Sequence, residues 1–265
     1  MPKSLSATLT SLALAMVLTT LISNCAIQNQ TSEKFIKDCV LPQDQVGTLS
    51  GRWNVTAVPV AFHEGDFSVE ETQDIIKAAD TWNRFYSYSL KMAALDYGDP
   101  SNPRTSSIAK PQALCSEGLI QGKRFVGNVV IYKQTPWPYP SSPDAIALTS
   151  FCPASVKSQP LPLMYMAIME VNYQNFFVDG RKLPDLQSIF LHEFGHLMGL
   201  DHSCERTNKD GVPNCTNPEM NQDYYRAVMF PIFAFNTTGS GEQKRMLLQN
   251  DQGRANCLYS DFIEK

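Results

Sequence analysis

The sequence predicts one mixed α/β domain of the α+β type, preceded by an N-terminal export signal. Residues 53–62 alternate apolar and polar side chains and are rich in β-branched residues, which is typical of a strand. Residues 68–85 place apolar side chains at helical spacing. Residues 163–173 form an almost unbroken apolar run, which indicates a strand buried on both faces. Strands and helices therefore alternate along the chain, as a mixed sheet covered by helices requires.

The first residues read as a signal peptide rather than as part of the fold. Lys3 is followed by the apolar run LALAMVLTTLI, which is too short for a typical membrane span. The run ends in LISNC, which resembles a bacterial lipobox and predicts lipidation of Cys25. The same resemblance to lipoproteins implies sorting to the outer membrane, because Ala26 rather than an acid follows that cysteine. We therefore expect a signal at residues 1–24 and an exported protein, either anchored in the outer membrane or secreted.

Composition and cysteine content agree with export. Apolar residues make up 43% of the chain, the formal net charge is −4, and no Lys/Arg run appears, which argues against a nucleic-acid partner. Setting Cys25 aside leaves an even number of cysteines, enough for three disulfides in an oxidising compartment. The sequence leaves their connectivity open. Cys204 and Cys215 are the pair we predict, because they bracket a polar loop.

The remaining elements follow in order. Residues 25–49 are polar with little periodicity and predict a tether, so the domain is expected at residues 50–265. Ser68 and Glu71 form a capping-box signature at the start of the first helix. Further strands are predicted from apolar segments, and a helix that opens at Pro184 or Asp185 is predicted to reach about Met198. The predicted strands are residues 88–98, 127–134, 145–153 and 163–173.

Three of the four histidines lie in the segment LHEFGHLMGLDHSC. His192 and His196 are four residues apart, so a helix presents both imidazoles on one face, where they can share a metal ion. Gly199 suits a helix end with positive φ, after which the chain can turn back and bring His202 to the same point. Three histidines leave one tetrahedral position open, as in catalytic zinc sites. Glu193 lies beside the first ligand, where it can act as a general base.

Two other interpretations of this segment are weaker. The histidines could be polar surface residues of an ordinary helix, or ligands of a structural zinc site. A structural site needs neither an acid at Glu193 nor an open coordination position.

The segment HEFGHLMGLDH resembles the HExxHxxGxxH signature of the metzincin metalloproteases. Within that group the chain is similar to the matrixins, because Ser203 follows the third histidine. AVMFP resembles the Met-turn, with Met229 as the methionine beneath the zinc, and Pro231 stands where astacins and serralysins have a tyrosine. AIALTSFCP, MEVNY and LQNDQGRANCLY resemble, in turn, the matrixin edge strand, the strand before the zinc helix and the closing helix. The resemblance covers roughly residues 51–259.

The resemblance implies a metzincin-like catalytic domain with a mixed twisted sheet, two long helices, a Met-turn and a C-terminal helix. It implies one catalytic zinc ion held by the three histidines, with Met229 packed below it as a floor. Leu148 and Thr149 would present main-chain groups to an extended substrate. Pro231 and Phe233 would help to form the wall of the pocket just beyond the scissile bond.

The chain also departs from the matrixin pattern. His63 is the one histidine left over, so the second, structural zinc site of vertebrate matrixins cannot be assembled. A calcium ion is compatible with the resemblance, but no motif for one is evident. An insertion that carries Cys204 and Cys215 lengthens the segment between His202 and Met229, so the family's substrate preferences are not carried over.

The sequence therefore predicts an exported zinc endopeptidase in which Glu193 acts as general base. Its expected partner is a protein or peptide substrate; we expect a monomer, with membrane contact only through an N-terminal lipid anchor. The alternative is a lipid-anchored, zinc-containing binding protein on a metzincin scaffold without general proteolytic activity. An intact Glu193 argues against that alternative, since a binding protein gains nothing from a base at this position.

Overall fold

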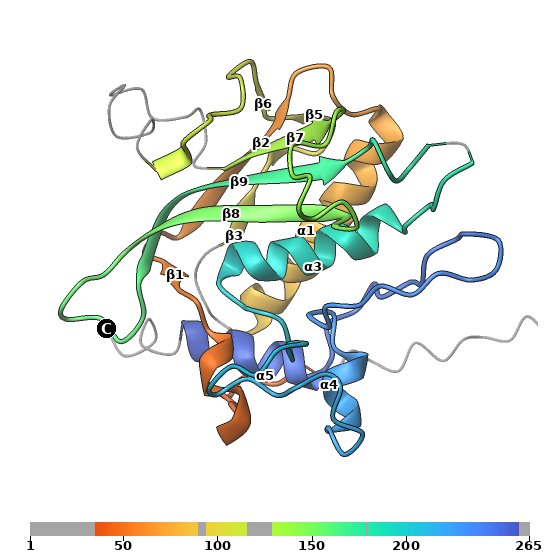
Figure 1. Ribbon diagram of the computed structural model, residues 1–265. Coiled ribbons are helices and arrows are strands. Elements are labelled where there is room, and N and C mark those ends of the chain that lie inside the picture. The colour runs from red at the N-terminus through yellow and green to blue at the C-terminus, as the bar shows by residue number, and fades with distance from the viewer. Residues whose placement is uncertain (1–34, 90–93, 116–128, 179, 260–265) are drawn as a thin grey trace, which may run out of the picture. The chain divides into compact units, whose positions relative to one another are not determined.

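A seven-stranded, mostly parallel sheet forms the centre of the fold (Figure 1). The computed structural model describes residues 35–89, 94–115, 129–178 and 180–259. The main strand order is β1-β9-β7-β2-β3, with β6 beside β2 and β8 beside β9, while β4 and β5 form a separate two-stranded sheet. The predicted α/β fold is confirmed. The strands are β1 (Arg52–Trp53), β2 (Ala57–His63), β3 (Ala94–Asp96), β4 (Gly98–Asp99), β5 (Asn102–Pro103), β6 (Thr105–Ser106), β7 (Val129–Gln134), β8 (Ala147–Ala154) and β9 (Leu163–Asn172).

Strand β8 is the one antiparallel member of the large sheet in the described part of the chain. It pairs along β9, from Ala147 opposite Val171 to Ala154 opposite Leu163. Its ladder with β9 is its only one within the described ranges, so no described strand pairs with its other edge. An unpaired strand edge presents main-chain N–H and C=O groups that can bind another extended chain.

Two long helices, α1 (Val69–Ser89) and α3 (Leu186–Met198), pack on one face of the sheet and on each other (Figure 1). The predicted capping box begins α1: Ser68 Oγ accepts from the Glu71 N–H at 3.2 Å, and Glu71 Oε2 accepts from the Ser68 N–H at 2.7 Å. Trp82 of α1 is fully buried, and its indole N–H donates to the Leu191 carbonyl of α3 at 2.9 Å. Burial of the α1 apolar stripe therefore also fixes the position of α3.

The predicted tether at residues 25–49 differs from the structure in its second half. The folded unit begins at Phe35, and the 3₁₀ helix η1 (Gln43–Thr48) carries the fully buried side chains of Gln45 and Thr48. A disulfide joins Cys39 to Cys257 of the last helix, α5 (Gln249–Leu258). Hydrogen bonds to main-chain groups, this cross-link and two separate apolar anchors, Phe35 and Leu49, hold residues 35–49 without an apolar stripe. Periodicity therefore could not reveal that they are folded.

The strand predicted at residues 88–98 is confirmed in part. In the described part of this segment, helix α1 continues through Ser89, and strand structure is present in β3 and at the start of the short β4. The strands predicted from the three later apolar segments correspond to β7, β8 and β9, and the predicted helix corresponds to α3.

Three disulfides are present in the described residues: Cys39–Cys257, Cys115–Cys152 and the predicted Cys204–Cys215. They indicate an oxidising, extracytoplasmic environment. None of the helices that the structure describes has the length and hydropathy of a membrane span. Cys25 and the predicted signal lie outside the described residues.

Candidate metal centre

Helix α3 begins and ends at defined caps, and both set the position of its histidines. At the start, Asp185 accepts from the Ser188 N–H at 3.0 Å and from its hydroxyl at 2.6 Å. At the end, Gly199 has φ 110°, and the Leu200 N–H donates to the Gly195 carbonyl at 2.9 Å. The chain therefore reverses at Gly199, as the sequence predicts, and leads directly into the segment with His202.

His192, His196 and His202 come together at one point, with their ligand atoms all within 4.8 Å of one another. His192 Nδ1 contacts the Val228 carbonyl and His196 Nδ1 contacts the Leu200 carbonyl, both at 2.7 Å. A carbonyl can only accept, so each of these Nδ1 atoms carries a hydrogen and each Nε2 keeps its lone pair.

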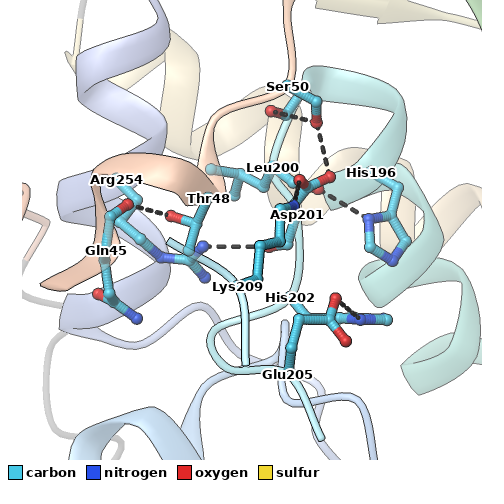
Figure 2. Close-up of polar contacts among 11 residues, drawn as sticks. Gln45, Thr48, Ser50, His196, Leu200, Asp201, His202, Glu205, Lys209 and Arg254 are labelled. Atoms are coloured by element: carbon cyan, nitrogen blue, oxygen red, sulfur yellow. Dashed lines mark hydrogen bonds and ion pairs between the residues drawn. The ribbon is translucent and has the colours of Figure 1, made fainter. Parts of the chain in front are cut away.

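The third histidine has an equivalent contact, between His202 Nδ1 and Glu205 Oε1 at 3.1 Å (Figure 2). The pKa of His192 is well below its usual value and that of His196 is lowered to about 4. Burial is the largest cause for both; His196 and His202 add to it for His192, and His202 adds to it for His196. Neutral imidazoles with a free Nε2 are the form that binds a metal ion. The donor set of this cluster thus fits a cation.

Glu193 lies next to this cluster without belonging to it. Its side chain is buried, and the Thr149 hydroxyl of β8 donates to Glu193 Oε2 at 2.7 Å. Burial raises the pKa of Glu193 to about 7, although the Thr149 hydrogen bond and His202 oppose the rise. A carboxyl group whose pKa is near neutral can both accept and release a proton.

Met229 is fully buried in the main core and packs against Gly195 of α3. Gly195 permits this approach, because a Cβ at position 195 would overlap the Met229 sulfur. Asp251 of α5 holds the turn at Val228 and Met229, since its carboxylate accepts from the N–H groups of both residues at 2.9 and 3.1 Å. The Val228 carbonyl in turn accepts from His192, so α5 is linked to the first ligand through this turn.

The segment after α3 is held from the N-terminal side (Figure 2). Ser50 Oγ donates to Asp201 Oδ1, and the Asp201 N–H donates to the Thr48 carbonyl, both at 2.8 Å. Gln45 Nε2 donates to the Ser203 carbonyl at 2.8 Å in a buried contact. These contacts restrain both flanks of His202.

A cavity of 670 Å³ lies beside the cluster, within the roughly 300–1,000 Å³ range of ligand sites. All four residues predicted to bind substrate line it: Leu148 and Thr149 from β8, and Pro231 and Phe233 from the segment after Met229. Lys244 also lines the cavity, where its ammonium donates to the Tyr225 and Ala227 carbonyls at 3.2 and 3.4 Å. Burial lowers the pKa of Lys244, while Glu242 at 3.7 Å and Asp251 raise it.

Sequence reasoning missed several polar residues around the cluster and its cavity. Asp251 and Lys244 act through contacts distant in sequence, and Glu205 lies three residues after His202 but belongs to no motif. Asp185 was predicted only as a possible start of the helix, where its place before an apolar periodic segment is the signal of a helix cap.

No protein-family model matches the chain, and a search of curated proteins finds no match to it. The geometry of the cluster and its cavity therefore carries the functional argument.

Proposed function

We propose that the protein is an exported zinc-dependent endopeptidase of the metzincin type, similar to the matrixins. The observation that carries the proposal is the combination of three convergent histidines with a buried carboxyl group that is outside the ligand set. Three neutral nitrogen ligands with an open fourth position suit catalytic zinc, and a structural site has no use for Glu193. Anchoring at the outer membrane through Cys25 is part of the same proposal.

The chain's own groups supply binding and proton transfer. The edge of β8 opposite β9, with Leu148 and Thr149, would pair with an extended peptide and lay it along the cavity. A zinc ion held by the three Nε2 atoms would supply a Lewis acid that acidifies water and polarises a peptide carbonyl.

Glu193 would take the proton from the attacking water and pass it to the departing amine. The Thr149 hydroxyl holds Oε2 of this carboxylate and thereby leaves Oε1 for the proton. Met229 would serve as a packed floor below the histidines rather than as a ligand, since its sulfur lies against Gly195.

The test is cleavage of a peptide library by the purified protein, beside Glu193→Ala and the exposed control Glu219→Ala, with zinc content measured on all three. We expect equal zinc in all three and cleavage by the wild type and the control, with a loss of about 10²-fold or more in Glu193→Ala. Cleavage by Glu193→Ala at the wild-type rate would remove Glu193 from the mechanism. Zinc in all three without cleavage by any would refute the endopeptidase and favour the binding protein. A folded wild type that takes up no zinc would refute both.

A further inference from the structure

His202 differs from the other two histidines in how its ring is held. His192 and His196 lie on α3 and donate Nδ1–H to main-chain carbonyls, whereas His202 follows the helix and contacts a side-chain carboxylate. Figure 2 shows Glu205 alongside the His202 ring. A ligand outside the helix depends more on this contact, because the helix backbone does not orient its ring.

The backbone of Glu205 is held on both sides. Its N–H donates to the Pro213 carbonyl and its carbonyl accepts from the Cys215 N–H, both at 2.8 Å. The preceding residue, Cys204, is fully buried and forms the disulfide with Cys215. The disulfide and this pair of hydrogen bonds close one short loop, residues 204–215, with Glu205 at its start.

We propose that Glu205 is a positioning residue for the third metal ligand, and that the Cys204–Cys215 loop exists to hold it there. An acceptor at His202 Nδ1 fixes the tautomer with a free Nε2 and sets the ring's direction, and a carboxylate acceptor also makes Nε2 a stronger donor to a cation. The proposal rests on metal binding by the cluster, which belongs to the proposed function, but not on peptide hydrolysis.

A purely structural role for Glu205 makes a different prediction. The side chains of His202 and Glu205 are 29% and 32% exposed, and pairs this accessible add little to stability. Replacing Glu205 should therefore leave the metal-free fold nearly as stable as before, while weakening its hold on a metal ion. A structural role would instead lower the stability of the metal-free protein.

The first test measures the zinc dissociation constant by chelator competition for the wild type, Glu205→Ala, Glu205→Gln and the exposed control Glu219→Ala. Thermal unfolding of the four metal-free proteins is measured beside it. We expect Glu205→Ala to bind zinc about 10- to 100-fold more weakly, with an unchanged melting temperature. Glu205→Gln should fall between, because its amide oxygen still accepts from Nδ1 but carries no charge. Zinc affinity of Glu205→Ala within twofold of the control would overturn the proposal, as would a wild type that binds no zinc.

The second test concerns the loop, with a Cys204→Ser/Cys215→Ser double variant alone and combined with Glu205→Ala. If the loop acts through Glu205, the double variant weakens zinc binding and the combined variant weakens it no further than Glu205→Ala does. If the combined variant shows the losses of zinc affinity of the double variant and of Glu205→Ala multiplied together, the loop does not act through Glu205. If the double variant does not fold, the comparison of Glu205→Ala with Glu205→Gln still decides the role of Glu205. Zinc binding is read without substrate, so an inactive wild type that binds zinc refutes the endopeptidase and leaves this test intact.

Discussion

Replacing Asp251 tests whether α5 supports the metal site through the Val228–Met229 turn. The carboxylate is fully buried and accepts three main-chain N–H groups, from Val228, Met229 and Leu248, at 2.9 to 3.1 Å. Asp251→Ala leaves all three donors without an acceptor. A buried unsatisfied donor costs about 1–3 kcal/mol, so with some relaxation the free energy of unfolding should fall by about 3–5 kcal/mol.

Asp251→Asn should cost less, about 1–3 kcal/mol, because one carbonyl oxygen remains and can serve one or two of the donors. The Val228 carbonyl is also the acceptor for His192 Nδ1, so both variants should bind zinc more weakly, by about tenfold for Asp251→Ala. Asp223→Ala, at an exposed carboxylate of α4 (Gln222–Arg226), is the control and should change neither quantity.

Urea unfolding of the metal-free variants, followed by tryptophan fluorescence, measures the first effect, and chelator competition measures the second. A loss of less than 1 kcal/mol in Asp251→Ala would mean that the turn finds other acceptors and is not held by α5. A full loss of stability with unchanged zinc affinity would refute the link from Asp251 to His192.

Three further predictions concern the helix caps and the cavity. Gly199→Ala should destabilise the protein by about 2–3 kcal/mol in urea unfolding, because φ is 110° and the new Cβ would overlap the Gly51 carbonyl oxygen. Burial opposes ionisation of Asp185, but hydrogen bonds from Arg245 and Ser188 outweigh it and lower its pKa. Ionised Asp185 therefore contributes its full share of the free energy of unfolding above a pH of about 4. That contribution is lost as the pH falls through the lowered pKa of Asp185. Asp185→Ala should cost about 1 kcal/mol at pH 7 and less than that in acid unfolding near pH 2. If the endopeptidase proposal holds, the Lys244 ammonium on the cavity wall should favour substrates with an acidic side chain. Cleavage of a peptide library by Lys244→Met should then shift toward peptides with an apolar side chain at that position.

The parts of the fold that could be predicted are those whose signal is local in sequence. The buried strand β9 and the helix α3 follow from unbroken or periodic apolar residues, and the histidine cluster follows from histidine spacing plus a glycine that permits the reversal. Even the strand edge beside the cavity coincides with a predicted strand, β8. Each of these features is decided within a short window of the chain.

The parts that could not be predicted depend on partners distant in sequence. Gln45 contacts Ser203, and Asp251 contacts Met229, through main-chain groups that every residue type offers. A polar side chain that binds backbone leaves no periodic pattern, so residues 35–49 looked like a tether. The end of helix α1 at Ser89 was predicted wrongly for a different reason: the polar and aromatic residues at its end suit a strand equally well.

Two of the three disulfides in the described residues secure segments outside the long helices and the sheet. His192 and His196 are held in place because α3 packs against both α1 and the sheet, but His202 lies in an irregular segment. The Cys204–Cys215 bond closes a short loop directly after it, with a sequence separation of 11. Cys39–Cys257, with a separation of 218, ties the N-terminal segment that contacts Asp201 and Ser203 to α5. In the chain-entropy model such links destabilise the unfolded chain by about 3 and about 5 kcal/mol. Disulfide formation in an oxidising compartment would thus give His202 the support that it cannot obtain from the helix, which links the proposed export to the proposed metal site.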